Sequence, residues 1–264
     1  MKFCAVIPCH NHGDTIGGVL ASLPPELDAV AIDDGSAEPV RLPASFGARA
    51  ASFADSAAAL SAGFPSEDFG GGRRVFVLRL EKNCGKAEAL KVGFAFAKKL
   101  GATHAITIDA DGQHSAEHLP RLMAAAEAAP QALVLAARDF SNPSVPRARR
   151  FMNKFSNFWF WAETGSRLGD TQCGFRVYPL ALIDSLDLRF GGFVFEVELL
   201  VKAAWLGAKF AQVKIPAVYT KAALRKSHYR PIADTLKFTL MNTRLFFASV
   251  FFSKPRLRRI ASKK

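Results

Sequence analysis

Short apolar runs alternate with helical patterns along the first half of the chain, and this alternation restricts the possible folds more than any other feature. Between the runs, Gly101 is placed to end one helix and Ser115 to begin the next. The sequence therefore predicts an α/β fold, a mostly parallel sheet flanked by helices. The runs typical of buried strands are residues 3–9, 28–34, 74–80, 104–110 and 132–138.

Polar side chains follow the ends of these predicted strands. His10 and Asn11 follow the first run, Asp33 and Asp34 end the second, and Asn83 lies just beyond the third. In parallel α/β sheets ligands bind beyond the carboxyl ends of the strands. The polar residues therefore predict a binding site along one edge of the sheet.

Two acidic residues stand one residue apart at the end of the 104–110 run. Asp109 and Asp111 are followed by Gly112 and Gln113. One interpretation is a solvated turn. The other is a cation site, because paired carboxylates with nearby oxygen donors suit a hard divalent ion that carries a phosphate. The common nucleotide motifs are missing, since no Gly-rich dinucleotide fingerprint follows the first run and Leu80 stands where a Walker loop needs glycine.

The chain is strongly basic. Its 264 residues include 35 Lys and Arg against 23 Asp and Glu, a formal net charge of +12. This favours polyanions, phosphate-bearing ligands or an anionic membrane surface as partners. RNA would use the same charge, but no recognisable nucleic-acid module is present, so we expect no nucleic-acid partner. Four cysteines at irregular spacings indicate a reducing compartment.

Two segments interrupt the strand–helix rhythm. Residues 37–73 are rich in Ala, Ser, Gly and Pro and predict a surface insertion in a domain of residues 1–230. Residues 231–264 are Phe-rich, and their last twelve residues, SKPRLRRIASKK, contain six basic side chains and no acidic one, which predicts an amphipathic segment on an anionic membrane surface. Without a signal peptide or an uninterrupted apolar window of about 20 residues, we expect a peripheral protein on the cytoplasmic face of a membrane.

Five motifs together resemble a known family in their order and approximate spacing. The chain is similar to the inverting family-two glycosyltransferases of the GT-A fold, and most of all to the dolichyl- or polyprenyl-phosphate mannose or glucose synthase group. The resemblance implies an enzyme that moves a hexose from a UDP- or GDP-sugar to a membrane-associated acceptor, with inversion of configuration. The motifs are AVIPCHNHGDTI, AIDDGS, NCGKAEALKVGFAFA, ITIDADGQHS and DTQCGFRVYP.

The resemblance also implies roles for residues on the donor side. Asp34 corresponds to the acidic residue that reads the base, and Asp109 to the first residue of the family's DxD motif. Mg²⁺ or Mn²⁺ would be held by Asp109, Asp111 and Gln113, and would neutralise the charge of the departing diphosphate. The residues implied in nucleotide-sugar binding are Pro8, His10, His12, Asp33, Asp34, Asn83, Lys86, Asp109 and Ala110.

On the acceptor side the interpretations stay open. Arg147 and Arg149 precede an aromatic stretch. The resemblance implies that the phosphate and lipid of the acceptor bind in this region. The alternative interpretation is an ordinary solvated basic helix face. Asp170 is a candidate catalytic base for a hydroxyl acceptor, a positioning residue for a phosphate acceptor, or a loop cap. Arg176 fits a phosphate clamp or a structural ion pair equally. The implied basic loop near the diphosphate contains Ser227 and His228.

Polyprenyl phosphate is the favoured acceptor. The runner-up is a lipid hydroxyl or a cell-surface glycan, with Asp170 as the base. A catalytically silent nucleotide-binding module on the membrane is the alternative from another class, and intact Asp109, Asp111 and Gln113 argue against it. A membrane partner protein is possible in each case.

Overall fold

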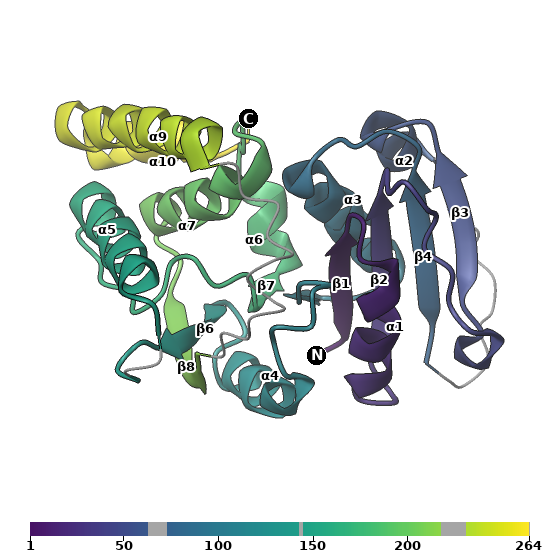
Figure 1. Ribbon diagram of the computed structural model, residues 1–264. Helices are drawn as coiled ribbons and strands as arrows, with labels where there is room; N and C mark the ends of the chain where they lie inside the picture. Colours follow the sequence, from purple (N-terminus) through teal and green to yellow (C-terminus); the bar gives the residue numbers. More distant parts are fainter. Residues whose placement is uncertain (63–72, 143–144, 218–230, 264) are drawn as a thin grey trace. The chain divides into compact units, whose positions relative to one another are not determined.

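The computed structural model describes residues 1–62, 73–142, 145–217 and 231–263, with the backbone alone for Phe193 and residues 231–235. The chain forms two compact units, Met1–Pro120 and Arg121–Lys264. In Figure 1 the first unit runs from purple to blue and the second from teal to yellow.

The first unit is built on parallel strands in the order β3-β4-β2-β1-β5. Every residue of β2 is buried, which explains why its sequence reads as a continuous apolar run before the two aspartates. The strands are β1 (Phe3–Cys9), β2 (Asp28–Asp34), β3 (Arg49–Phe53), β4 (Val75–Leu80) and β5 (His104–Thr107). The helical elements are α1 (Gly13–Ser22), η1 (Ala44–Phe46), α2 (Ser56–Ser61), α3 (Lys86–Lys99) and η2 (Ala116–His118).

Helix α3 packs directly on β1 and β2. The close approach depends on Gly93, because a Cβ atom there would lie 2.3 Å from Val6 Cγ1. Leu90 and Phe94 lie on the same face of α3 and are buried. This packing fixes the amino end of α3 beside the carboxyl ends of the strands.

The predicted surface insertion 37–73 contains both a helix and a strand. Besides α2, it supplies β3, which pairs with β4 as an edge strand. The sequence did not predict this strand, because Arg-Ala-Ala-Ser-Phe has little β propensity and is largely exposed. Residues 63–72 lie outside the described part of the chain.

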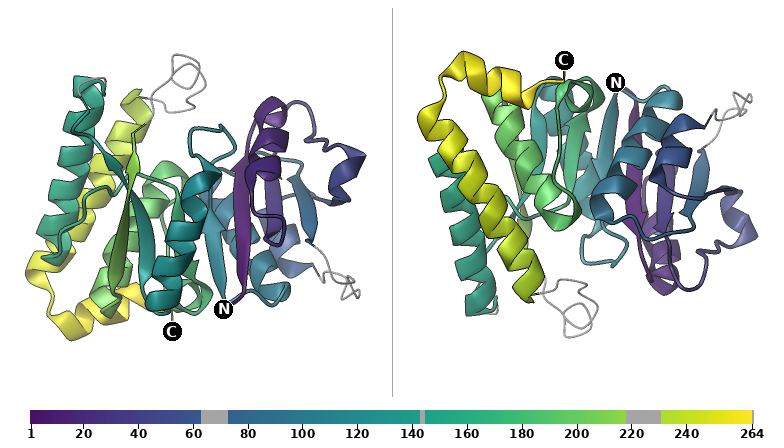
Figure 2. Two further views of the ribbon diagram at one scale, coloured as in Figure 1. Left: turned by 90° about the horizontal axis from the view of Figure 1, so that it is seen from below. Right: turned by 90° about the horizontal axis from the view of Figure 1, so that it is seen from above.

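The second unit has strands in the order β7-β6-β8, with β6 parallel to β8 and antiparallel to β7. Helix α7 is almost entirely buried and packs against α5 and α10, while α5 also packs along α9 (Figures 1 and 2). The strands are β6 (Leu133–Asp139), β7 (Arg176–Pro179) and β8 (Phe210–Pro216). The helical elements are α4 (Leu119–Ala128), α5 (Arg147–Thr164), α6 (Leu180–Ser185), η3 (Gly192–Val194), α7 (Phe195–Leu206), α9 (Pro231–Phe251) and α10 (Lys254–Ala261).

The predicted fold class is confirmed. Parallel pairing dominates the described strands, and helices flank them in both units. None of the helices in the described part of the chain combines the length and apolarity needed to cross a bilayer. The proposed boundary between residues 230 and 231 stays a prediction.

Candidate functional site

Asp34 organises the donor-side edge of the first unit. Its carboxylate accepts hydrogen bonds from the backbone N–H groups of Cys84 (2.7 Å) and Gly85 (2.8 Å), just ahead of α3. Burial raises the pKa of Asp34, and these two N–H groups counteract the rise. The neighbouring Gly35 has φ +62°, and a Cβ there would lie 2.4 Å from the backbone nitrogen of Asn83, so only glycine fits. Asp34 therefore fixes the loop that presents Asn83 and the start of α3.

Asp33 is fully buried, and the chain itself engages both carboxylate oxygens. They accept from the backbone N–H groups of Ser36 (3.1 Å) and Val40 (3.0 Å), and Arg79 forms an ion pair at 2.7 Å. These contacts shape the loop after β2. The expected role of Asp33 in nucleotide binding stays a prediction.

His10 connects three strand-end loops. Its Nδ1 lies 2.7 Å from the carbonyl oxygen of Asp34, and its Nε2 lies 3.0 Å from the amide nitrogen of Asn83. A carbonyl can only accept, so a neutral His10 carries its proton on Nδ1 and accepts at Nε2. Asn11, with φ +56°, receives a hydrogen bond from the backbone of Ala37 and donates its own N–H to Ser36. His10 and Asn83 are thereby brought together beside Asp34.

The acidic pair lies in the loop after β5. Asp109 forms an ion pair with Lys86 at 2.9 Å, and His114 Nε2 lies 4.0 Å from its other oxygen. Asp111 accepts a hydrogen bond from the backbone N–H of Gln113 at 2.9 Å. Burial raises the pKa of Asp111, the charge of Asp109 adds to the rise, and nearby His114 and His12 oppose it. The structure thus gathers Lys86, Asp109 and Asp111 at one edge.

Thr15 is a supporting residue that the sequence analysis missed. Its hydroxyl donates to the backbone carbonyl of Ala110 at 2.6 Å and so ties α1 to the acidic loop. Pro8 lies half-buried in β1, and His12 is buried immediately before α1. A threonine on the first turn of a helix gives no distinctive sequence signal, which is why this contact was not foreseen.

The donor set fits a divalent ion that is shared with a phosphate ligand. Among the described residues, no group of three or more His, Cys, Asp or Glu side chains forms a complete protein cage. Asp109 and Asp111 supply two carboxylates, and magnesium-type ions are usually held by one or two carboxylates together with substrate phosphates. A cation between them would also relieve the repulsion that raises the pKa of Asp111.

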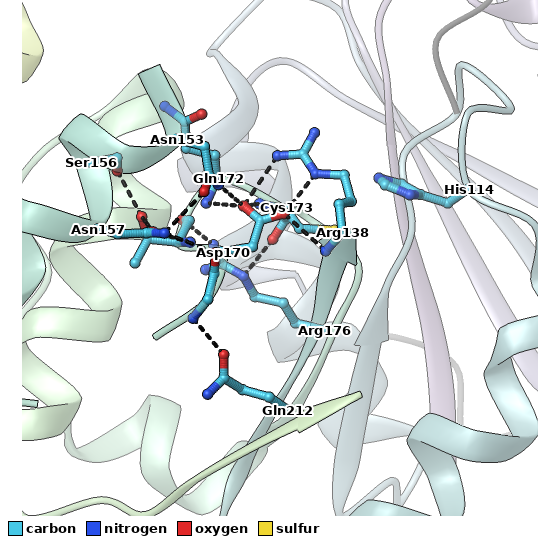
Figure 3. A network of polar contacts seen from close by, with 12 residues as sticks. His114, Arg138, Asn153, Ser156, Asn157, Asp170, Gln172, Cys173, Arg176 and Gln212 are labelled. Atoms are coloured by element: carbon cyan, nitrogen blue, oxygen red, sulfur yellow. Dashed lines mark hydrogen bonds and ion pairs between the residues drawn. The ribbon is translucent and has the colours of Figure 1, made fainter. Parts of the chain in front are cut away.

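In the second unit, Asp170 is the centre of a saturated polar network (Figure 3). The side chain is fully buried and forms an ion pair with Arg138 at 2.6 Å. Asn153 and the backbone N–H groups of Gln172 and Cys173 also donate to it, at 2.7, 3.0 and 3.1 Å. Both oxygens are therefore occupied by protein donors. Asp170 holds Arg138 and the loop after α5 in place.

Arg138 is the second residue that the sequence analysis missed. It ends the buried run of β6 and keeps a partly exposed guanidinium, with its side chain 18% accessible. Its position could have been noticed, because it carries the same signal as Asp33 and Asp34: a charged residue at the carboxyl end of a buried strand.

The polar face of α5 clamps the same loop. The Ser156 hydroxyl lies 2.7 Å from the Thr171 hydroxyl, and Asn157 donates to the carbonyl of Gly169 at 2.8 Å (Figure 3). On the other side, the Gly169 N–H donates to Gln212 at 2.6 Å. Three aromatic side chains of α5, Phe151, Phe158 and Trp161, are exposed, whereas Phe160 of the same helix is fully buried.

Arg176 is fully buried and contacts the loop that contains Asp170. Its guanidinium donates to the backbone carbonyls of Cys173 (2.7 Å), Thr171 (2.8 Å) and Glu196 (3.0 Å). These contacts join the loop to the start of α7. They supply a structural role, and the phosphate-clamp role stays a prediction.

Arg147 and Arg149 are exposed in the first turn of α5, which contains no acidic residue. The amino end of a helix is the positive end of its dipole, so cations there are mutually unfavourable and a bound anion would be stabilised. Arg150 uses its guanidinium to cap the carbonyl of Asn142 at 3.1 Å. Ser227 and His228 lie outside the described residues.

Two relatives resemble the chain over long stretches. An undecaprenyl-phosphate mannosyltransferase from Micrococcus luteus is 26% identical over 227 residues, covering 83% of this chain and 84% of the relative. A polyprenol monophosphomannose synthase from Mycolicibacterium smegmatis is 27% identical over 157 residues, covering 57% of this chain and 58% of the relative.

A solved structure shares the fold. Glucosyl-3-phosphoglycerate synthase from Mycobacterium tuberculosis, in complex with Mn²⁺, UDP and phosphoglyceric acid, matches with a TM-score of 0.59 at 18% identity, covering 96% of this chain and 79% of that chain. This likeness confirms the predicted GT-A fold class. The family model described as glycosyl transferase family 2 matches residues 52–187, more than half of the chain. The chain therefore belongs to glycosyl transferase family 2 and is a glycosyltransferase.

Proposed function

We propose that this glycosyltransferase moves a hexose from a UDP- or GDP-sugar to polyprenyl phosphate at a membrane surface, with inversion at the anomeric carbon. The observation that carries the donor half is the convergence of Lys86, Asp109 and Asp111 beside the loop that Asp34 fixes. The polyprenyl-phosphate half is supported by the names of the two relatives.

On the donor side, each residue has a distinct task. His10 and Asn83 line the position for the nucleoside, next to the carbonyl of Asp34. Lys86 supplies a positive charge for the diphosphate, and its ion pair with Asp109 keeps the amine at this edge. A divalent ion held by Asp109, Asp111 and Gln113 would supply neutralisation of the charge that grows on the leaving diphosphate.

On the acceptor side, the proposed substrate needs no strong base. A phosphate monoester is already ionised near neutral pH and can attack directly. Asp170 then acts as a positioning residue for Arg138, in keeping with its occupied oxygens. Arg138, Arg147 and Arg149 supply guanidinium groups that suit a phosphate. A base role for a hydroxyl acceptor is less supported, because a base needs an oxygen free to take the proton.

The second unit carries an apolar surface suited to a lipid interface. Helices α5 and α9 lie side by side (Figures 1 and 2), and we define the apolar face as the exposed apolar side chains of these two helices. Basic residues of α10 follow it along the chain. This combination fits peripheral binding to the anionic cytoplasmic leaflet, with or without a membrane partner protein. The members of the apolar face are Phe151, Phe158, Trp161, Leu236, Leu240, Phe247, Val250 and Phe251.

The test is a transfer assay with purified chain, Mn²⁺ and vesicles that contain polyprenyl phosphate, supplied with UDP- or GDP-hexoses. One donor should yield an organic-extractable glycolipid, and NMR of the product should show the opposite anomeric configuration. Retention of configuration would overturn the inverting mechanism. Transfer only to glycan or hydroxyl acceptors would overturn the proposed acceptor and restore the runner-up.

Donor binding can be tested separately through Cys84. It is the one cysteine that is not buried, and its backbone N–H is held by Asp34. A nucleotide in the proposed site should therefore slow alkylation of Cys84 at least fivefold in the presence of Mn²⁺. Equal alkylation rates with and without every nucleotide would move the donor site elsewhere.

A further inference from the structure

A cavity of about 990 Å³ lies among α7, α9 and α10 in the second unit. Neither Arg138 nor Asp170 lines this cavity, and no residue of the loop after α5 does. Its walls are mainly apolar and come from all three helices, with Trp205 on α7, Phe251 on α9 and Ile260 on α10. Sites of this size and lining usually take small organic ligands, with a few polar groups that fix their orientation.

Four arginines line the cavity, and one of them, Arg189, forms an ion pair with Asp187 at 2.7 Å. The other three, Arg244 on α9 and Arg256 and Arg259 on α10, are exposed. Within the described residues, none of them forms an ion pair with a carboxylate, although Arg256 lies 4.2 Å above the ring of Phe252. These guanidinium groups are the type of donor that binds phosphate oxygens in pairs.

The carboxylate that lines the cavity does not offset this charge. Glu198 is fully buried, and forms an ion pair with Lys202 at 2.7 Å. It also accepts from the backbone N–H groups of Arg189 and Phe190 at 3.0 and 2.8 Å. These internal contacts engage the carboxylate of Glu198. It therefore does not neutralise the arginines, and the exposed side of the cavity remains positively charged.

The cavity opens at the apolar face defined above. Phe247 and Phe251 line it and are also 53% and 71% exposed. The cavity therefore combines apolar walls with exposed arginine side chains. This combination matches an amphiphile with hydrocarbon chains and an anionic head.

We propose that this cavity binds a single anionic phospholipid of the membrane, with its acyl chain against Trp205 and Ile260 and its phosphate on Arg244 and Arg259. The proposal does not rest on the identity of the sugar acceptor. With this site, the second unit binds one class of membrane lipid selectively, in addition to its binding to the membrane surface.

The test uses the full chain in mild detergent and native mass spectrometry with phosphatidylglycerol or phosphatidylcholine. One phosphatidylglycerol should bind per chain, at least tenfold more tightly than phosphatidylcholine. The double variant Arg244→Gln/Arg259→Gln should weaken this binding at least tenfold. The matched control Lys237→Gln/Arg258→Gln removes the same charge from the same two helices outside the cavity lining and should change the binding less than twofold.

A second variant tests the apolar part. Ala248 lines the cavity, so Ala248→Trp should fill it and abolish one-to-one binding while the melting temperature stays within about 2 °C. Equal weakening by both charge-removing doubles, equal affinity for the two lipids, or unchanged binding in Ala248→Trp would overturn the proposal. Binding of glycerol phosphate alone would reduce the site to an anion site, and preferential displacement by a prenyl phosphate would assign it to the acceptor; either result overturns the proposal. Nucleotide binding should stay unchanged throughout, which separates this test from that of the proposed function.

Discussion

Asp111 and Asp170 are both carboxylates in strand-associated loops, yet the two units treat them in opposite ways. In the first unit, Asp111 accepts one backbone hydrogen bond, lies near Asp109 and has a raised pKa. In the second unit, Asp170 is fully buried and receives Arg138, Asn153 and backbone donors on both oxygens. The comparison indicates that the protein donors around a loop aspartate decide whether its oxygens stay available to a ligand.

The largest effect is expected at Asp111. Asp111→Asn should lower kcat/KM for transfer about a thousandfold, or ~4 kcal/mol, because the neutral amide cannot compensate a cation beside the diphosphate. Its melting temperature should not fall, since burial already disfavours the charge of Asp111. The control is Glu117→Gln, whose side chain is 70% exposed nearby, and it should keep full activity. Wild-type turnover by Asp111→Asn would show that transfer does not need the charge of Asp111, and would contradict the proposed difference between Asp111 and Asp170.

Asp170→Asn should act mainly on stability. Breaking its buried ion pair with Arg138 should cost about 3–5 kcal/mol in the free energy of unfolding, measured by urea denaturation. Nucleotide affinity of the folded fraction should be unchanged, because its contacts all belong to the second unit. Asp139→Asn, at an exposed neighbour, should cost less than about 0.5 kcal/mol. Wild-type stability in Asp170→Asn would contradict its role as a positioning residue.

Glu163 is a buried carboxyl in α5 that offers a pH test in the second unit. Neither of its oxygens has a hydrogen-bond partner within the described structure, and burial raises its pKa from 4.5 to about 9. The folded state therefore holds the proton that the unfolded state releases, and stability should fall between pH 4.5 and about 9 by at most about 1.4 kcal/mol per pH unit.

Glu163→Gln should remove this dependence. Its stability should exceed that of the wild type by about 2 kcal/mol or more at pH 8 and equal it near pH 4.5, as followed by thermal melts across pH. Glu127→Gln, at an exposed position, should show no such trend. Parallel curves for Glu163→Gln and the wild type would show that Glu163 is charged in the fold.

The smallest effect is expected at the start of α5. Arg147→Gln/Arg149→Gln should raise the acceptor KM about five- to tenfold and the donor KM less than twofold, because both guanidinium groups are exposed and screened by solvent. Arg121→Gln, an exposed arginine on α4, is the control and should change neither constant. A larger change in the donor KM would place the diphosphate, rather than the acceptor, at these arginines.

The sequence predicted the parts of the fold that depend on buried apolar runs. The bounds of β1 and β2 agree with the predicted runs, because a strand buried on both faces shows as an unbroken apolar stretch. β5 ends at Thr107, three residues earlier than predicted, because Ile108 and Ala110 are buried within the acidic loop instead of in a strand. Edge strand β3 gave no such signal, since exposed strands need few apolar residues.

The site was predictable in its residues but less so in their roles. The strand-end positions of Asp34, Asp109 and Asp111, and the place of Lys86 at the start of α3, follow from the alternation of elements. Whether a carboxylate is free or saturated depends on partners distant in sequence, and no local pattern shows that Arg138 would occupy Asp170, 32 residues away. Thr15 was missed for the same reason, whereas Arg138 stands at the end of a predicted strand and could have been noticed.

The central claim is that Asp109 and Asp111 hold a divalent ion against the nucleotide. Titration calorimetry of UDP and GDP into the full chain, with and without Mn²⁺, tests it directly against the double variant Asp109→Asn/Asp111→Asn. We expect Mn²⁺ to tighten nucleotide binding at least tenfold in the wild type and to have no effect in the double variant. Metal-independent binding in the wild type, or the same Mn²⁺ enhancement in both proteins, would contradict it.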